Sequence, residues 1–578
     1  MDQEKKSTTA LPEHTTHTDF DAEKKDSSSQ DKEYMFDKMN TVEEAGYDPN
    51  ENGAEHKEHP IQRSLYQKYR KFILPGMWVL FTGFLIAAFV LQVPKGYNQE
   101  LLILGLIYLY FTLYVLFVFV PTTIVSKPWN YCIDTTSSYL YAHTSPLTRM
   151  VAYGILVGIV IIVTVFTFPE KDESPRIRRL ISCFGLFVFI AGTFACSKHR
   201  KHVPWNTVSS AILIQFLLAL FVFRSTAGHD IFSWLATFAE GYLSKAWHGT
   251  DFVFGDTVAN AGIFAVSVFP AIIFFAATVQ VLYYTGTIPF LLKYLSRACM
   301  KILNVSGAES IVTIASPFLG QSENALLIEP LIPLLTKSEF HQIMTCGFAT
   351  ISGSTLYGYI AMGVSGQALL TSCIMSIPCS IAISKIRYPE SEESKVAHIT
   401  EVSHDKDTSN ALHAAGKGAA VGINIVLLVL ANLIAILALL NAVNAFLTWV
   451  GNFVTIQNLT LQLITGYVFV PIAWLIGADD KDLVAVGTLM ANKVWANEFV
   501  AYQLLTSTYK DQLTARSYLV ATYALCGFGN LSSVGMQVGV LNSLAPKRSG
   551  DISSLALSAM ICGCISTWLS ASIAGMLI

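Results

Sequence analysis

Charged residues are scarce in this sequence: Asp, Glu, Lys and Arg make up 14% of its 578 residues. A soluble globular chain contains about a quarter charged residues, so the deficit indicates that lipid forms a large part of the solvent. The formal net charge is only −3, which gives no reason to expect nucleic acid or an acidic partner. The charges gather in residues 1–71, in loops and just after Tyr388.

Spacings typical of metal sites, disulfide frameworks and catalytic sites are also missing. Most of the ten cysteines lie in or beside apolar runs, where cysteine is a small packing residue, and no doubled CxxC occurs. We therefore expect no structural disulfide, no zinc and no cofactor. The histidines supply no nucleophile–base set, so no enzyme is predicted. The absence of a Walker-type phosphate loop argues against an ATP-driven pump.

Long apolar runs, in contrast, are abundant, and a membrane-spanning helix needs about 20 apolar residues. Backbone groups in hydrocarbon must be paired, which runs of this length achieve as helices. The sequence thus predicts an all-α polytopic membrane protein with about 11 transmembrane helices. The predicted spans are Phe72–Val93, Leu101–Val120, Met150–Phe168, Leu180–Cys196, Trp205–Phe223, Ala261–Tyr284, Ile343–Val364, Ala368–Ile386, Ala419–Ala445, Ser517–Leu541 and Ile552–Ile573.

The polar residues 1–71 cannot bury enough apolar surface to fold, so we expect a disordered tail without a cleaved signal peptide. Lys and Arg beside the first predicted span and in the loop after the fourth place this tail in the cytoplasm. Two amphipathic segments, Asp230–Trp247 and Pro289–Leu303, are predicted to lie in the membrane interface. The remaining chain divides into N-terminal membrane helices at 72–196, scaffold and interfacial helices at 197–303, a first repeat at 304–388, a polar connector at 389–416 and a second repeat at 417–578.

Two regions with polar residues amid apolar ones predict re-entrant hairpins, each with two arms too short to cross a membrane. The first is Ser306–Thr336 and the second is Asp482–Ser507, and a span broken by small polar residues follows each of them. The order of span, hairpin, broken span and span therefore occurs twice, with an odd number of crossings each time, so we expect inverted repeats. In transporters, paired interrupted segments at corresponding positions mark the substrate site.

Each hairpin carries a carboxylate near its tip, Glu323 in the first and Glu498 in the second. An ionised side chain at the bilayer centre costs at least ~2.5 kcal/mol, which favours a functional role for both. The structural alternative is mutual pairing, such as Glu498 with Lys493. Ser352 and Ser354 in the first broken span are equally well explained as packing residues.

Four ordered motifs resemble those of the concentrative nucleoside transporter family. They are Gly320–Asn324 (GQSEN), Gly347–Ser354 (GFATISGS), Asn497–Tyr502 (NEFVAY) and Ala521–Ser533 (ATYALCGFGNLSS). The extra N-terminal spans and the polar tail resemble a eukaryotic, fungal-type member. The resemblance implies a plasma-membrane symporter that imports nucleosides, with purine nucleosides and uridine as substrates. It also implies a homotrimer whose transport domain moves like an elevator.

Through the matching motifs, the resemblance assigns two sets of substrate-binding residues. An amide can both donate and accept at the edge of a base, and a carboxylate accepts hydrogen bonds from a ribose diol. The residues implied for the nucleobase are Gln321, Ser322, Glu323 and Thr355. The residues implied for the ribose are Glu498, Phe528, Asn530 and Ser533.

The coupling ion is the point at which this sequence departs from the family pattern. Sodium-coupled members have an Asn where this sequence has Ser316, and a hydroxyl is a poorer ligand for a hard cation than a carboxamide oxygen. We therefore predict proton coupling with Glu323 as the carrier and Glu498 as the alternative carrier. Sodium coupling is the alternative, with ligands from Leu319, Thr350 and Ile351.

A channel is the main competing class, because channels also use re-entrant segments. The sequence contains no filter-like segment and no uniformly charged pore ring, which favours a transporter. The choice between purine and pyrimidine nucleosides is left open, because one hydrogen bond at the edge of a base is enough to change selectivity.

Overall fold

The computed structural model describes part of 101–116 and the ranges 65–92, 146–170, 175–396 and 408–578. All regular elements within these ranges are helices, as the sequence predicts. The chain divides into two compact units, Met1–Leu140 and Tyr141–Ile578. Most of the predicted tail, and much of the predicted span Leu101–Val120, fall outside the described residues.

In the first unit, helix α2 (Leu65–Gln92) begins at Leu65 rather than at Phe72. The end of the predicted tail is therefore helical. The residues before Phe72 are rich in Leu, Gln, Lys and Arg, which are good helix formers, so the helix extends beyond its apolar run.

Seven helices in the described residues are long and apolar enough to cross a membrane. All seven coincide with predicted spans. They are α2, α6 (Arg176–Ala195), α7 (Trp205–Arg224), α11 (Phe264–Tyr284), α17 (Gly366–Arg387), α18 (Ala411–Phe453) and α24 (Ser549–Leu577). The predicted span Met150–Phe168 corresponds to α5 (Pro146–Thr167), whose apolar stretch Val151–Thr167 is slightly shorter than those of the seven.

The sequence pattern did not predict helix α19 (Leu461–Leu475). Its 15 residues are fewer than the roughly 20 that a straight crossing needs, and Pro471 lies inside it. The two amphipathic segments are helical as predicted, as α8 (Thr226–Leu243) and α12 (Thr287–Leu303). The shorter elements are α9 (Ala246–Phe254), α10 (Asp256–Ala259) and the 3-10 helices η2 (Arg200–His202), η3 (Glu329–Leu334), η4 (Asp480–Asp482) and η5 (Pro546–Arg548).

Both predicted hairpins are present as pairs of short helices. The first consists of α13 (Gly307–Ala315) and α14 (Gln321–Leu327). The second consists of α20 (Leu483–Trp495) and α21 (Glu498–Ser507). The first hairpin leaves α12 at an angle of 119°, because Asn304 ends α12 in the left-handed conformation that Asn tolerates better than most residues.

Both predicted broken spans are also present. The first consists of α15 (Lys337–Ala349) and α16 (Gly353–Ala361), and the second of α22 (Ala515–Leu525) and α23 (Leu531–Leu544). In the second break, Gly527 has a φ of +113°, and a Cβ there would lie 2.8 Å from the carbonyl oxygen of Phe348. Only glycine fits this backbone without strain.

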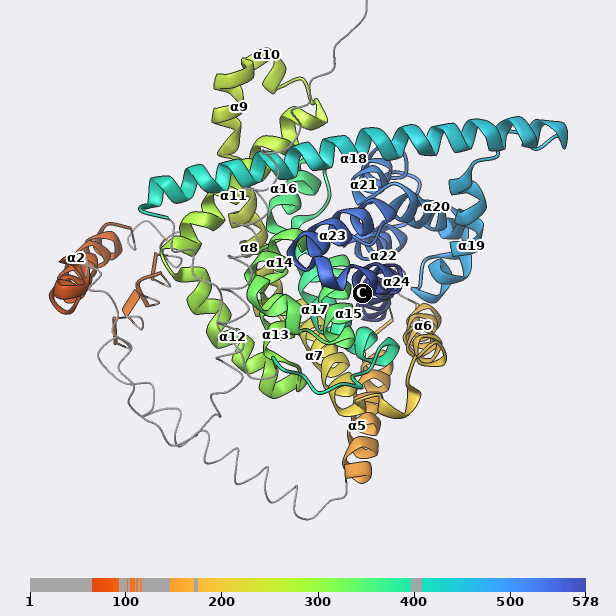
Figure 1. Ribbon diagram of the computed structural model, residues 1–578, viewed down its shortest axis with the longest axis horizontal. Coiled ribbons are helices and arrows are strands. Elements are labelled where there is room, and N and C mark those ends of the chain that lie inside the picture. Colours follow the sequence, from red (N-terminus) through yellow and green to blue (C-terminus); the bar gives the residue numbers. More distant parts are fainter. Residues whose placement is uncertain are drawn as a thin grey trace, which may run out of the picture. The chain divides into compact units, whose positions relative to one another are not determined.

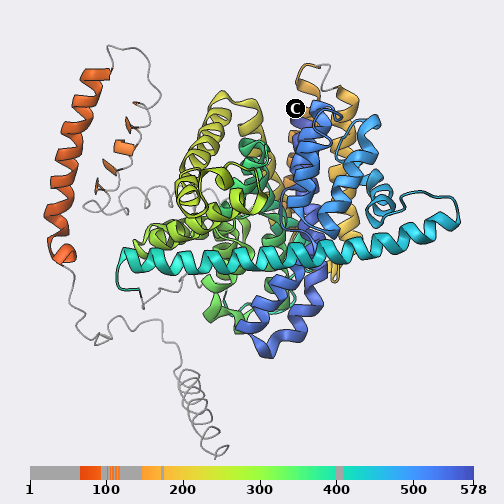
Figure 2. The same cartoon turned by 90° about the horizontal axis from the view of Figure 1, so that it is seen from above.

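Helices α17 and α24 form the centre of the second unit, whereas α18 runs along its outside (Figures 1 and 2). In the most apolar stretch of α17, 83% of the residues are buried, against 11% in α18. The 43 residues of α18 exceed one crossing, so this helix extends well past the predicted span Ala419–Ala445. The interior is thus built by the two repeats, with α18 as one outer wall.

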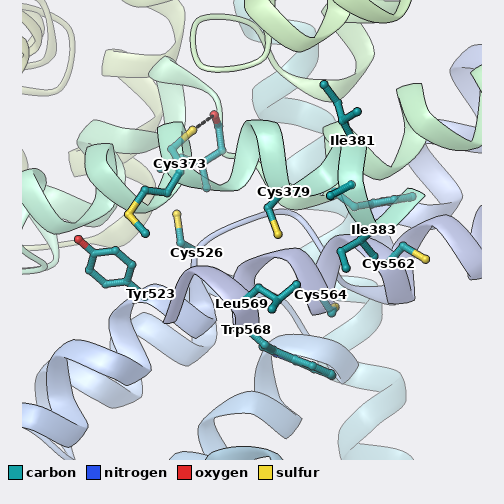
Figure 3. Close-up of a cluster of buried hydrophobic side chains, with 14 of the residues drawn as sticks. Cys373, Cys379, Ile381, Ile383, Tyr523, Cys526, Cys562, Cys564, Trp568 and Leu569 are labelled. Carbon is teal, nitrogen blue, oxygen red and sulfur yellow. Dashed lines mark hydrogen bonds between the residues drawn. The ribbon is translucent and has the colours of Figure 1, made fainter. Parts of the chain in front are cut away.

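Cysteines contribute to the packing between α17 and α24. Figure 3 shows Cys373, Cys379 and Cys526 near Leu569 of α24, whereas Trp568 points away from α17. The Cys373 thiol donates to the carbonyl oxygen of Ile351 at 3.5 Å in the first break. The Cys564 thiol donates to the carbonyl oxygen of Gly529 at 3.3 Å in the second break. The two breaks therefore have matching contacts.

The start of the polar connector is packed against the first hairpin rather than solvated throughout. Thr336 donates to a carboxylate oxygen of Glu390 at 2.8 Å, and the hydroxyl of Ser394 donates to Glu339 at 2.5 Å. The carbonyl oxygen of the buried Val396 accepts from the backbone N–H of Gly307 at 3.3 Å. The connector thus covers the N-terminal ends of α13 and α15.

Candidate functional site

The N-termini of four short helices, α14, α16, α21 and α23, border one cavity of about 140 Å³. Three of these helices begin with a side-chain cap, at Ser352, Asn497 and Asn530, whose oxygen accepts from the backbone N–H three residues later. Helix N-termini carry partial positive charge, so the four ends favour electronegative groups in the cavity. The breaks in the sequence pattern therefore meet at one place.

Glu498 lies in this cavity and is 3% exposed. The hydroxyl of Tyr359 on α16 donates to one of its carboxylate oxygens at 3.0 Å, and the Asn530 amide donates to the other at 2.8 Å. Tyr359 belongs to the first repeat and Asn530 to the second. Glu498 is thus fixed by donors from both repeats, and an acceptor with two oxygens still has lone pairs that face the cavity.

Lys493 does not pair with Glu498, although the sequence left that open. Its amine donates to the carbonyl oxygens of Ala524 and Cys526 and to the hydroxyl of Thr567. Among the described residues, no ion pair includes Glu498 or Glu323. Neither carboxylate therefore forms an ion pair with a described Lys or Arg side chain at the cavity.

Among the described residues, Glu323 is held by its own turn alone, where it accepts from the backbone N–H of Gly320. Next to it, the Gln321 amide donates to the carbonyl oxygen of Ser533 at 3.4 Å. The side-chain oxygen of Gln321 is buried and has no hydrogen-bond partner. A buried acceptor without a partner costs free energy, so this oxygen is suited to a donor on a bound ligand.

Seven of the eight predicted substrate residues line this one cavity. The seven are Gln321, Glu323, Thr355, Glu498, Phe528, Asn530 and Ser533. The eighth, Ser322, has a side chain outside the described part of the structure. Phe528 is half-buried and gives the cavity an aromatic wall.

Besides Glu323, the four residues predicted for the coupling ion lie at the first hairpin and the first break. Ser316 donates its hydroxyl proton to Val312 O at 2.7 Å and accepts from the Asn324 amide at 3.0 Å. The same amide reaches the carbonyl oxygen of Leu319 at 3.4 Å. Thr350 and Ile351 supply carbonyl oxygens at the break, which accept from the Phe528 N–H and the Cys373 thiol.

Three features of this site escaped the sequence predictions. Asn324 is one, and its buried side-chain oxygen has no partner. Tyr359, which orients Glu498, is another. The third is the outer wall of the cavity, formed by Ile425, Leu428, Val429 and Asn432 of α18. Asn432 is a polar residue inside a predicted span, and it was the one signal that could have revealed this wall.

Comparison with known proteins identifies this arrangement of hairpins and breaks. The family model described as Na+ dependent nucleoside transporter C-terminus matches residues 368–575. The model of the corresponding N-terminus matches residues 184–257. A model described as Gate, nucleoside recognition, matches residues 265–366. The first hairpin lies within the Gate match and the second within the C-terminal match.

Individual relatives agree with these family models. Sodium/nucleoside cotransporter 1 of Rattus norvegicus is 40% identical over 422 residues, which cover 70% of this chain and 65% of that protein. The chain therefore spans slightly less than two thirds of that relative's length. Solute carrier family 28 member 3 of Rattus norvegicus is 33% identical over 584 residues, which cover 95% of this chain and 81% of that protein.

A solved structure, that of CNTnw in an inward-facing substrate-bound state, is 34% identical and superposes with a TM-score of 0.65. The match covers 70% of this chain and 98% of that one. The hairpins, the broken helices and the convergent cavity thus occur in a chain with three matching family models and a relative matched over 81% of its length. The protein belongs to the concentrative nucleoside transporter family.

Proposed function

We propose that this protein is a secondary active transporter that imports nucleosides together with a cation. The observation that carries the proposal is the cavity, in which a fixed carboxylate and an unpartnered amide oxygen come from opposite hairpins. A nucleoside has the complementary chemistry, because its ribose offers hydroxyl donors at one end and its base offers N–H donors at the other.

The ribose occupies the Glu498 end of the cavity in this proposal. Glu498 already accepts from Tyr359 and Asn530, which fixes the directions of its remaining lone pairs. Hydrogen bonds to a charged acceptor contribute about 1.5–3 kcal/mol each. Phe528 supports the sugar on the side of the second break, and Ser533 adds a hydroxyl at the start of α23.

The base occupies the end near the first hairpin. Gln321 offers its free oxygen there, and Glu323 and Thr355 line the same region. Thr355 donates its hydroxyl proton to the carbonyl oxygen of Ser352 at 3.0 Å, so the oxygen of its hydroxyl remains an acceptor. Ser322 stays a proposed base contact through its place in the same motif.

We propose sodium as the coupling cation. Two of the three family models and the rat cotransporter are named for sodium, which does not support the proton coupling that the sequence predicted. The first hairpin and break also offer oxygens of the kind that hard cations prefer, from Ser316, Leu319, Thr350 and Ile351. Asn324 adds a buried carboxamide oxygen without a partner, which supplies the ligand type missing at Ser316.

Proton coupling is the second candidate, and one contact favours it. The Asn324 amide donates to both Ser316 and Leu319, so two of the oxygens that a sodium ion needs are already engaged. Glu323 has no cationic partner among the described residues and accepts only one hydrogen bond, so its carboxylate is accessible to a proton. Glu498, the alternative carrier, already accepts hydrogen bonds from Tyr359 and Asn530, which favour its ionised form.

The assembly and movement are proposed from the family. We infer a homotrimer in the plasma membrane with a cytoplasmic N-terminus, in which α11 and α18 belong to a fixed scaffold. The hairpins and broken spans of the two repeats, at 307–361 and 483–544, then form the moving transport domain. Solved structures of CNTnw are described as inward-facing, intermediate and outward-facing, which supports an elevator movement in that relative.

Uptake of labelled adenosine and uridine tests the proposal, in cells that lack nucleoside transport. Uptake is measured with sodium or choline as the main cation, at acidic and at neutral pH. Sodium-dependent accumulation at both pH values is the expected result. Acid-stimulated accumulation in choline would show that the coupling cation is the proton and not sodium. No uptake by protein shown to be at the cell surface would overturn the proposal of nucleoside transport itself.

A further inference from the structure

Lys493 is a buried cation in the first arm of the second hairpin. Its side chain is 1% exposed, and its amine donates to Ala524 O at 2.9 Å, Cys526 O at 3.4 Å and the Thr567 hydroxyl at 3.3 Å. None of the ion pairs among the described residues includes it. Burying a charge that forms no ion pair costs free energy, so a functional role would explain why Lys493 is buried here.

The three acceptors match an ammonium group. A charged lysine has three N–H donors and no acceptor, and the site offers two carbonyl oxygens and one hydroxyl oxygen. The Thr567 hydroxyl proton is directed to Ala524 O or Cys564 O, which leaves its lone pairs for the amine. The surroundings of the amine are therefore neutral oxygens, the same ligand type that hard cations select.

These oxygens belong to the break between α22 and α23. Cys526 follows the last residue of α22, where helix carbonyls have no partner in their own helix. The chain then passes Phe528 and reaches Asn530, which caps α23 and donates to Glu498. Lys493 thus ties the second hairpin to the segment that positions the ribose end of the cavity.

The first repeat has a matching break, but its buried cation, Lys385, pairs with Glu309 near the start of α13 and not at the break. The thiol contacts of Cys373 with Ile351 O and of Cys564 with Gly529 O relate the two breaks to each other. Residues 307–327 of the first hairpin contain neither Lys nor Arg. Neutral donors contact the carbonyl oxygens there, namely the Asn324 amide at Leu319 and the backbone N–H of Phe528 at Thr350.

We propose that the Lys493 ammonium is a tethered cation that holds the second hairpin against its broken helix, as the mobile coupling cation does in the first repeat. The second repeat therefore needs no ion from solution, and its ribose site is assembled before substrate arrives. This inference rests on the proposed function, because the coupling cation of the first repeat is part of it. Lys493 acts as a positioning residue, since it touches neither the cavity nor the substrate.

Removal and replacement of the charge test the proposal. In Lys493→Ala, uptake of adenosine and uridine should fall at least tenfold, and methylammonium in the bath should restore part of it by filling the vacated space with a small cation. In Lys493→Met, the neutral side chain fills that space, so the loss should persist with methylammonium. The matched control is Asn492→Ala, whose amide contacts only Thr488 O of its own helix, and it should transport normally.

Wild-type uptake by Lys493→Met would overturn the proposal, because the charge would then be dispensable. Equal failure of both variants with no response to methylammonium would also overturn it, as a purely structural role predicts. The thermal stability of the purified protein gives an independent reading. If the wild type carries no nucleoside, the proposed function fails, yet stabilisation of Lys493→Ala by methylammonium, and not of the wild type, would still support a cation site.

Discussion

Glu323 and Glu498 stand at the tips of two hairpins built from the same order of elements, yet they are held differently. Glu498 accepts from two side chains, one in each repeat, and Lys493 anchors the adjoining break. Glu323 accepts from a backbone N–H of its own turn. The second tip is therefore pre-organised and the first is free to adjust. A rigid second tip fits the ribose, which all nucleosides share. An adjustable first tip fits the base, which varies, and a coupling cation that binds and is released in each transport cycle.

Glu498→Gln should have the largest effect, because it weakens the fixed end of the site. Two hydrogen bonds to a charged acceptor contribute about 3 kcal/mol or more, so uptake should fall by about 100-fold or more. The loss should be equal for adenosine and uridine, which share the ribose. Initial rates over a range of nucleoside concentrations measure it, with exposed Glu240→Gln as the control. A loss that depends on the base would break the assignment of the two ends.

Glu323→Gln should have a smaller and less uniform effect. The amide oxygen of Gln can still accept from the Gly320 N–H, so the turn is kept. Uptake should fall about tenfold, the effect of losing one hydrogen bond between the substrate and a charged acceptor. The loss should differ between adenosine and uridine, because their bases present different donors to this end. Glu329→Gln, an exposed change on the same hairpin, is the control. A loss equal in size and uniformity to that of Glu498→Gln would remove the distinction between the tips.

The elements that form this contrast differ in how far the sequence predicts them. Both hairpins and both breaks were predictable, because polar residues and helix breakers in an apolar run leave backbone groups that must be paired inside the protein. Cavity residues such as Gln321 and Glu498 followed from motifs at those breaks. Helix α19 was not predictable, because its 15 residues fall below the length of a straight crossing.

Long-range contacts explain most of what the sequence did not predict. In the sequence, Tyr359 is one more aromatic residue in an apolar run, and its hydroxyl contacts Glu498 from 139 positions earlier in the chain. The polar composition of the connector favours a solvent-exposed segment. In the structure, however, Glu390 and Ser394 form hydrogen bonds with Thr336 and Glu339, which lie about 50 residues earlier in the chain. Lys493 is near enough to Glu498 in the sequence to suggest an ion pair, but the break between α22 and α23 supplies the oxygens that its amine contacts.

Asn324→Ala should weaken the apparent affinity for sodium and leave the apparent affinity for the nucleoside largely unchanged. It removes a carboxamide beside Ser316 and Leu319, so the sodium concentration for half-maximal uptake should rise about fivefold, the equivalent of roughly 1 kcal/mol. Ser316→Asn adds a carboxamide there and should lower that concentration. Sodium titrations at fixed adenosine measure both. A change in apparent adenosine affinity with no change in the sodium titration would place Asn324 at the base instead.

Tyr359→Phe should have an equally small effect, and it tests whether the second tip depends on the first repeat. The variant keeps the ring that packs against Phe499 and Tyr502, at centroid distances of 4.7 and 5.0 Å, and loses only the hydroxyl that donates to Glu498. A hydrogen bond to a carboxylate contributes about 1.5–3 kcal/mol, but Asn530 still holds Glu498 and the substrate loses no contact of its own, so about 1 kcal/mol, or fivefold, of apparent affinity should be lost. The change should be the same for adenosine and uridine, because Tyr359 acts through the ribose end, and the maximal rate should stay near that of the wild type. A base-dependent change would mean that Tyr359 contacts the base directly. A loss as large as that of Glu498→Gln would mean that the carboxylate is held from the first repeat alone, with Asn530 contributing little.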